Sequence, residues 1–155
     1  MTIYHAQDNK EFMHQLLKGG VFDLFEAREV YINTFTSFEI HCNYHKDFFP
    51  PDSAQDRKYC LWKEIKPYAF DIIKGSRLPK LIKIILAADK EKTNEISSNA
   101  SALFLNITYE NGNITCITGS STKNFTLDKT VEYQWDAFVS EFLKQNQVVV
   151  STQSY

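Results

Sequence analysis

The sequence predicts a single α+β domain, in which an antiparallel sheet carries two helices on one face and a further helix follows near the C-terminus. Two segments alternate apolar and polar residues with the period of a half-buried strand, residues 38–45 and 103–109. The dipeptide Asn111-Gly112 comes soon after the second segment, and Asn-Gly is the strongest short signal for a hairpin turn. Apolar residues recur at helical spacing in three other stretches, near residues 9–18, 61–73 and 136–146.

The first predicted helix covers residues 9–18. Asp8 stands where its carboxylate can accept hydrogen bonds from the free N–H groups of the first turn. Glu11 stands at the third helical position, where it would complete a capping box. We expect the pair Gly19-Gly20 to end this helix with a residue of positive φ.

Between this helix and the next, β-branched and aromatic residues predict two half-buried strands within residues 24–49. The proline pair at 50–51 breaks the pattern and predicts a surface loop to about Arg57. A second helix follows over residues 61–73, and Pro67 must either begin it or kink it. Gly75 marks its end.

The central part of the chain predicts a strand, a loop and a hairpin. Residues 81–88 have the composition of a strand, and the polar segment 89–100 is the best candidate for a disordered loop. The hairpin pairs strands of about residues 102–109 and 113–119.

The C-terminal part continues the strand rhythm through residues 125–135 and then predicts a helix with its N-cap near Asp136. The apolar stripe of that helix is spaced i, i+3, i+4, i+7, i+8 and comprises Trp135, Phe138, Val139, Phe142 and Leu143. Residues 148–150 form a last short strand. The whole chain, 1–155, is therefore expected to be one domain with three helices and about eight strands.

Composition limits the class of protein. Hydrophobic residues make up 43% of the chain, the net charge is −2 and the pI is about 6.1, which excludes a histone-like polycation and a disordered tail. The N-terminus has no signal-peptide pattern, and the longest apolar run, residues 84–88, is far too short to cross a bilayer. The three cysteines are widely spaced, so we expect a cytoplasmic protein without disulfides. We also expect no membrane contact and no cofactor.

One candidate metal site comprises His41, His45 and Asp47, which alternate along an extended segment and so share a face. Two imidazoles and a carboxylate are ligands that suit zinc or iron. However, His41 and His45 would stand about 13 Å apart along a straight strand, so sharing one ion requires a bend. This set is kept as a weaker alternative.

A cysteine enzyme is a second chemical alternative, in which Cys42, Cys60 or Cys116 would meet a histidine in space. Two of these residues lie on strand patterns where a cysteine is usually a small core residue. The sequence contains no GxSxG, P-loop or GxGxxG motif. An enzyme is therefore the less favoured class.

The charge distribution is uneven. Residues 57–83 hold eight basic and two acidic side chains, a net charge of +6, which leaves −8 for the rest of the chain. Basic residues on one face of each of the first two helices could form a surface that contacts phosphates without reading bases. The predicted contact residues are Lys10, Lys18, Lys63, Lys66, Lys74 and Arg77.

Four motifs, TFTSFEI (34–40), HKDFF (45–49), IKGSRLP (73–79) and WDAF (135–138), occur in an order that resembles an uncharacterised family of Firmicutes proteins. The resemblance spans nearly the whole chain. It implies a cytosolic bacterial protein of unknown function and supplies no catalytic residues.

The order of elements is also similar to one half-domain of the DNA sliding clamps, whose two helices carry basic residues toward DNA. The extra C-terminal helix and the single domain depart from that pattern. The leading hypothesis is therefore a clamp-like, non-enzymatic module that binds nucleic acid or a partner protein through its helices. A protein-interaction or assembly subunit, which could be a homo-oligomer, is a further alternative because aromatic residues are numerous.

Overall fold

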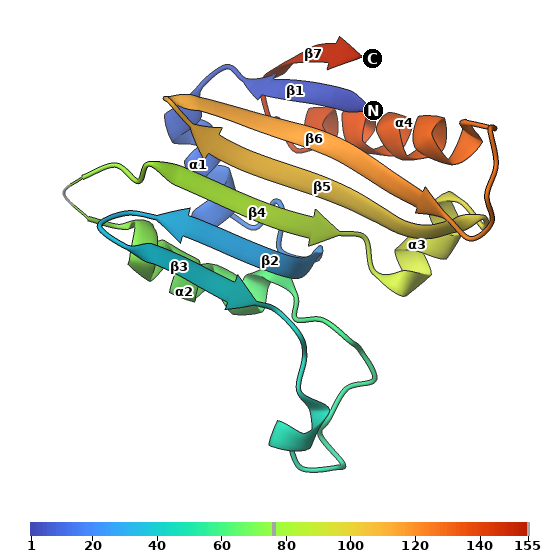
Figure 1. Ribbon diagram of the computed structural model, residues 1–155, viewed down its shortest axis with the longest axis horizontal. Coiled ribbons are helices and arrows are strands. Elements are labelled where there is room, and N and C mark those ends of the chain that lie inside the picture. The colour runs from blue at the N-terminus through green and yellow to red at the C-terminus, as the bar shows by residue number, and fades with distance from the viewer. Residues whose placement is uncertain (76, 155) are drawn as a thin grey trace.

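The computed structural model describes residues 1–75 and 77–154, so Ser76 of the third motif lies outside the described residues. Within that part of the chain, a seven-stranded antiparallel sheet packs against four α-helices (Figure 1). In chain order the elements are β1 (Thr2–Ala6), α1 (Asn9–Leu17), β2 (Glu26–Asn33), β3 (Ser37–His41), the 3-10 helix η1 (Lys46–Phe48), α2 (Trp62–Ile73), β4 (Leu81–Ala87), α3 (Lys90–Ile96), β5 (Ala100–Glu110), β6 (Asn113–Thr122), α4 (Thr130–Gln145) and β7 (Val150–Ser154). The predicted fold class is confirmed.

The strands lie in the order β3-β2-β4-β5-β6-β1-β7, and every neighbouring pair is antiparallel. One row of opposed residues crosses five of these strands, through Val30, Ile84, Ile107, Cys116 and Tyr4. All five side chains are buried. Because opposed residues project to the same side of a sheet, they define one core face.

Helices α1, α2 and α4 cover this face (Figure 1) and share one core cluster with it. Trp62 of α2 and Trp135 of α4 are its largest fully buried side chains. The indole N–H of Trp62 donates to the carbonyl of Leu16, and that of Trp135 to the carbonyl of Phe104, each at 2.8 Å. Both polar atoms are thus satisfied inside the core, as buried N–H groups require. No helix in the described ranges is long and apolar enough to cross a membrane.

The Asp8 cap of α1 is as predicted, but the end of the helix is not. The Asp8 carboxylate accepts the N–H of Glu11 at 3.1 Å. Neither Gly19 nor Gly20 has a positive φ; the helix ends because the N–H groups of Lys18 and Gly19 both bond to the carbonyl of His14. The bond from Gly19 spans five residues and closes a wide final turn, which here needs no residue of positive φ.

The predicted hairpin is confirmed and longer than expected. Asn111 and Gly112 have φ values of 52° and 75°, the two positive φ angles that a type I′ turn requires. Pairing then extends to Ala100 opposite Thr122. In the second predicted helix, Pro67 lies inside α2 and does not begin it.

The prediction of a disordered loop at 89–100 was wrong, because most of that segment forms α3. The Asp89 carboxylate caps the helix by accepting the N–H of Lys92 at 2.7 Å, and Thr93 is buried. The polar composition of this segment does not indicate the short helix, which is stabilised by the Asp89 cap and the buried Thr93.

The strand predicted over 125–135 was also wrong. Helix α4 begins at Thr130, so Asp136 lies inside it and is not its cap. The spacing of Val131 and Trp135 is compatible with a strand, which has a period of two, and with a helix, where residues four apart share a face. Tyr133, midway between them, would share their buried face in a strand, but it is exposed, as a helix requires. The stripe predicted for the later part of this helix is confirmed, since Trp135, Val139 and Leu143 are buried. The last strand runs from Val150 and not from residue 148.

Residues 42–61 leave the sheet between β3 and α2 as a projecting segment, which we call the arm (Figure 1). Its base is paired through the bridge between Asn43 and Tyr59 and through the N–H of Cys60, which donates to the carbonyl of Cys42 at 2.9 Å. Helix η1 lies near its tip. The arm is therefore a paired extension of the sheet with an irregular end.

Candidate functional sites

The six predicted phosphate-binding cations belong to α1, α2 and the residues that follow each helix; we call the region that they define the α1–α2 surface. The two helices pack against each other on the same face of the sheet. Lys18, after α1, lies over the ring of Phe70 of α2 at 5.1 Å. Lys66 of α2 donates to the carbonyl of Gly19 at 3.0 Å. The structure thus brings Lys18 and Lys66 together at the junction of the helices.

Two of the six cations are held by carboxylates. Lys66 forms an ion pair with Asp23 at 2.6 Å, and its side chain is only 15% exposed. Lys74 pairs with Asp71 at 3.1 Å, in an exposed i, i+3 arrangement. Lys66 is thus part of the packing between α1 and α2, whereas Lys74 can exchange its partner in solvent.

The other four cations, Lys10, Lys18, Lys63 and Arg77, are exposed. None of them forms an ion pair with a carboxylate in the part of the chain that the structure describes. The acidic residues nearest in sequence to Lys63 and Lys18 are already engaged, since Glu64 binds Arg57 and Asp23 binds Lys66. These four cations therefore have no ion pair of their own in the described ranges, and the exposed Asp8 and Glu11 flank Lys10.

The candidate metal ligands are not brought together. His41, on β3, contacts Glu29 at 2.6 Å and Glu39 at 3.6 Å through its two ring nitrogens. His45 and Asp47 lie beyond the strand, in the arm. Among residues 1–75 and 77–154, no group of three His, Cys, Asp or Glu side chains is placed to hold a metal ion.

The three cysteines are free thiols with unfavourable surroundings for ionisation. Burial raises the pKa of Cys42 to about 12 and also raises the pKa of Cys116. Burial raises the pKa of Cys60 as well. Since the thiolate is the nucleophile, these residues are protonated and unreactive at neutral pH.

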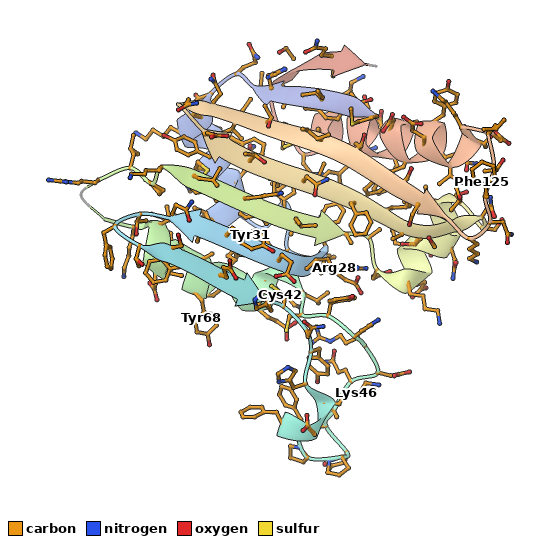
Figure 2. The ribbon with its side chains drawn as sticks, viewed as in Figure 1. Arg28, Tyr31, Cys42, Lys46, Tyr68 and Phe125 are labelled. Atoms are coloured by element: carbon orange, nitrogen blue, oxygen red, sulfur yellow. The ribbon has the colours of Figure 1, made fainter. Side chains whose placement is uncertain are left out.

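A cleft of about 1390 Å³ lies where the ends of β2, β4 and β5 meet the arm and α3. Its floor contains Arg28, whose guanidinium stacks over the ring of Tyr59 at 3.8 Å and lies 5.4 Å from the ring of Phe104. Arg28 also donates two hydrogen bonds to one oxygen of Glu26, at 3.1 and 3.3 Å. Figure 2 labels Arg28 beside the base of the arm and Lys46 farther along it.

Arg28 reaches this position because the register of β2 shifts between Ala27 and Glu29. Such a bulge re-aims the extra residue. Burial raises the pKa of Glu26, although Arg28 opposes the shift. This pair was not among the residues predicted from the sequence. The available signal was a pair of opposite charges two residues apart in a predicted strand, which places Glu26 and Arg28 on one face.

The arm carries an ordered set of aromatic rings. Phe49 stacks on Tyr44 with a centroid distance of 5.2 Å, and Arg57 covers the Tyr44 ring at 4.4 Å. Arg57 is in turn bound by both oxygens of Glu64 of α2, at 2.5 and 2.8 Å. These contacts fix the base of the arm to the body, while the ring of Phe48 near the tip is 82% exposed.

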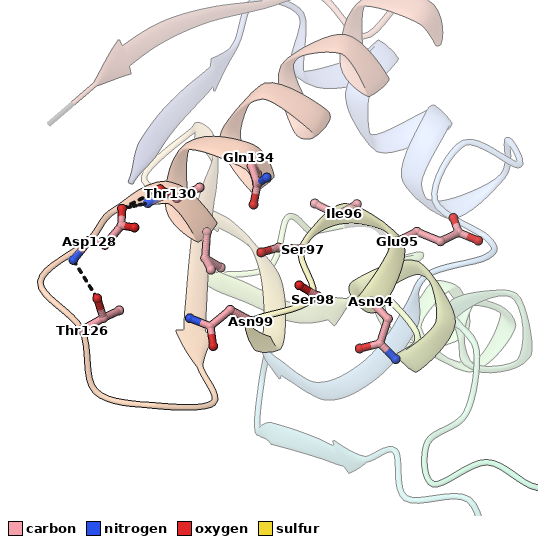
Figure 3. Close-up of a pocket in the computed structure, with 11 residues that line it drawn as sticks. Asn94, Glu95, Ile96, Ser97, Ser98, Asn99, Thr126, Asp128, Thr130 and Gln134 are labelled. Carbon is pink, nitrogen blue, oxygen red and sulfur yellow. Dashed lines mark hydrogen bonds between the residues drawn. The ribbon is translucent and has the colours of Figure 1, made fainter.

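A second, smaller pocket of about 460 Å³ lies between α3 and the first turn of α4 (Figure 3). The Asp128 carboxylate accepts hydrogen bonds from the backbone N–H and the hydroxyl of Thr130, at 2.9 and 2.5 Å, and these bonds lower its pKa. The N-terminus of α4 therefore already has an anionic partner from its own chain. The remaining lining is mostly hydroxyl and amide groups, which select no ligand class.

Comparison with known proteins yields one match. A model for a family of unknown function, DUF5721, matches residues 15–151. No curated protein and no solved structure matches the chain. The matched range includes α2, the arm and the cleft.

Proposed function

Because the chain belongs to the DUF5721 family, whose function is unknown, we propose a function from the geometry: a non-enzymatic module that binds the phosphate backbone of nucleic acid on its α1–α2 surface. The observation that carries the proposal is the set of four exposed cations, Lys10, Lys18, Lys63 and Arg77, that no carboxylate neutralises within the described residues. Lys10 and Lys63 lie in α1 and α2, which pack against each other, and Lys18 and Arg77 follow these helices, so the proposal takes the four cations as one surface. Lysine and arginine side chains on a helix surface are the usual partners of phosphate oxygens.

The internal ion pairs change the expected number of phosphate contacts. Lys66 is committed to Asp23 and to the carbonyl of Gly19, so it contributes little to an external ligand. Lys74 shares its charge with Asp71 in a weak, exposed pair, so we count it as at most a partial contact. We therefore expect about four phosphate contacts and not six.

The experiment is a salt titration of duplex DNA binding to the full chain. Each neutralised phosphate changes the slope of log K against log salt by about −0.9, so four contacts give a slope of about −3.6. A slope near zero, or no binding at about 50 mM salt, would exclude the proposal. Binding that does not change with base sequence is also expected, because helix-face cations read the backbone alone.

The enzyme alternatives have less support. The thiols are protonated at neutral pH, and the candidate ligands His41, His45 and Asp47 do not converge in the described part of the chain. A clamp-like role is part of the same proposal and rests on the order of elements alone, whereas a place in bacterial cytoplasm rests on the resemblance of the four motifs.

A further inference from the structure

We propose that two copies of this chain form a dimer in which the arm of each docks into the cleft of the other. The inference rests on the arm and the cleft, and it is independent of nucleic-acid binding on the α1–α2 surface. The arm comprises residues 42–61, and the cleft lies where the arm and α3 meet the ends of β2, β4 and β5.

The tip of the arm is an exposed apolar group of four consecutive residues, Phe48 to Pro51. Phe48 is 82% exposed and Phe49 38%, and both prolines are also exposed. The two phenyl rings meet edge to face with a centroid distance of 5.4 Å. An aromatic cluster at the end of a projection is the kind of group that buries itself in a partner's pocket.

The arm is ordered before it binds. Tyr44 accepts the backbone N–H of Gln55 at 3.2 Å and donates its own backbone N–H to the carbonyl of Lys58 at 2.9 Å. The two-oxygen pair between Arg57 and Glu64 anchors the same segment to α2. A preorganised contact segment loses little conformational entropy on docking, which favours association.

The size of the cleft indicates a segment of protein chain as its occupant. Its volume of about 1390 Å³ exceeds the roughly 300–1,000 Å³ that pockets for small molecules occupy. Its floor holds the stacked pair of Arg28 and Tyr59, both partly exposed, which an aromatic ring of a partner can contact.

The charges of the cleft indicate which segment. Its lining holds cations and anions in almost equal numbers, six against five: Arg28, Lys46, Arg57, Lys58, Lys90 and Lys123, with Glu26, Asp47, Asp56, Asp89 and Glu91. A nucleic-acid strand or an acidic peptide would require an excess of cations. A mixed wall instead fits a partner surface that also carries both signs.

The arm itself has this mixed character. The arm supplies Lys46, Lys58, Asp47 and Asp56 to the lining of its own cleft. The arm of a second copy therefore brings the same mixture of positive and negative side chains to the α3 side of the cleft. Lys58, Lys90, Asp47 and Glu91 have no ion-pair partner within the described ranges and are available across such an interface. When the chain that receives an arm returns its own arm to the same partner, the exchange is reciprocal and closes at two chains.

The test is the mass of the full chain in solution, measured by light scattering at about 100 μM, where a micromolar Kd populates the dimer. We expect twice the chain mass of 18.0 kDa, and a return to the single-chain mass in Phe48→Ser. The matched control is Phe125→Ser, which removes a 93% exposed ring from the β6–α4 connection, at another edge of the molecule (Figure 2), and should remain dimeric. A monomeric wild-type protein, or equal effects of both substitutions, would overturn the proposal.

A second measurement identifies the surface that the arm touches. A photoreactive phenylalanine analogue at position 48, in a mixture of isotope-labelled and unlabelled chains, should cross-link between chains to peptides of the cleft that contain residues 26–28, 57–59, 88–94 or 100–102. Inter-chain cross-links to any other region would mean that the dimer forms by a different contact, and would contradict arm exchange.

Discussion

The α1–α2 surface and the arm both hold basic side chains against carboxylates, but the ion pairs have different consequences. On the helices, Asp23 binds Lys66 and thereby removes a charge from the surface that would meet a ligand. In the arm, Glu64 binds Arg57 and thereby fixes a segment whose exposed groups are aromatic. The first pair lowers the positive charge at the helix junction, and the second holds in place the segment that carries exposed aromatic rings.

This difference shows why a count of lysines in the sequence overestimates the basic surface. A cation contributes to phosphate binding only if no carboxylate of its own chain holds it. The four cations that meet this condition lie near the ends of α1 and α2, whereas Lys66 lies between the helices. Substitution of the paired Lys66 should therefore lower stability, whereas substitution of an unpaired cation should weaken phosphate binding.

The largest effect is expected where the helices are anchored to the core. Trp62→Ala removes a fully buried indole and its bond to the carbonyl of Leu16, so the free energy of unfolding should fall by about 3–5 kcal/mol. Phe48→Ala removes an aromatic ring from the arm and should change the monomer's stability by less than about 0.5 kcal/mol. Chemical denaturation measures both; equal losses would show that the arm is part of the core.

A smaller effect separates two lysines on the same helix. Lys66→Met leaves the half-buried Asp23 carboxylate without its partner and should lower the free energy of unfolding by about 1–3 kcal/mol. Lys63→Met changes an exposed side chain and should alter it by less than about 0.5 kcal/mol. Denaturation of the two variants side by side is the measurement, and similar values would mean that the Lys66–Asp23 pair contributes nothing to packing.

In the arm, removal of the anchoring charge should act locally. Glu64→Gln weakens both hydrogen bonds from Arg57, so we expect faster amide exchange at Tyr44 and Cys60 with little change in the rest of the sheet. Asp71→Asn, on the same helix but paired only with Lys74, is the control and should leave exchange in the arm unchanged. Uniform loss of protection across the protein would contradict a local role.

Acid should have the same effect as that substitution. The hydrogen bonds from Arg57 lower the pKa of Glu64 from its ordinary value of 4.5. Since the folded-state pKa is depressed, the stabilisation is complete above pH 4.5 and is lost as the pH falls through the folded-state pKa. Exchange or NMR shifts of the arm followed from pH 6 downward should therefore show opening below about pH 4.5, and Glu64→Gln should remove that transition. A transition unchanged in the variant would assign it to another group.

The sequence predicted most of the sheet and the three large helices because their signals are local. The Asn111-Gly112 turn, the Asp8 cap and the apolar stripe of α4 each depend on residues that are close together in the chain. The start of α4 was misjudged because spacings of two and four coincide at Val131 and Trp135. The cleft could not be predicted, since Arg28 meets Tyr59 and Phe104 only through a bulge and long-range pairing.

The same limit applies to the candidate sites. The sequence predicted the two helices that carry these basic residues, and the helices pack against each other. It could not show that Asp23, which precedes Lys66 by 43 positions, closes on that lysine. Charge neutralisation by a distant residue is a property of the fold and has no signature in a local pattern.

The most direct test of the account is the salt dependence of DNA binding by Lys63→Met and Lys66→Met, compared with the wild-type chain. We predict that Lys63→Met makes the slope of log K against log salt less steep by about 0.9, the contribution of one phosphate, and that Lys66→Met leaves the slope unchanged. The opposite pattern, or no change in either variant, would contradict the assignment of the binding surface to the unpaired cations of α1 and α2.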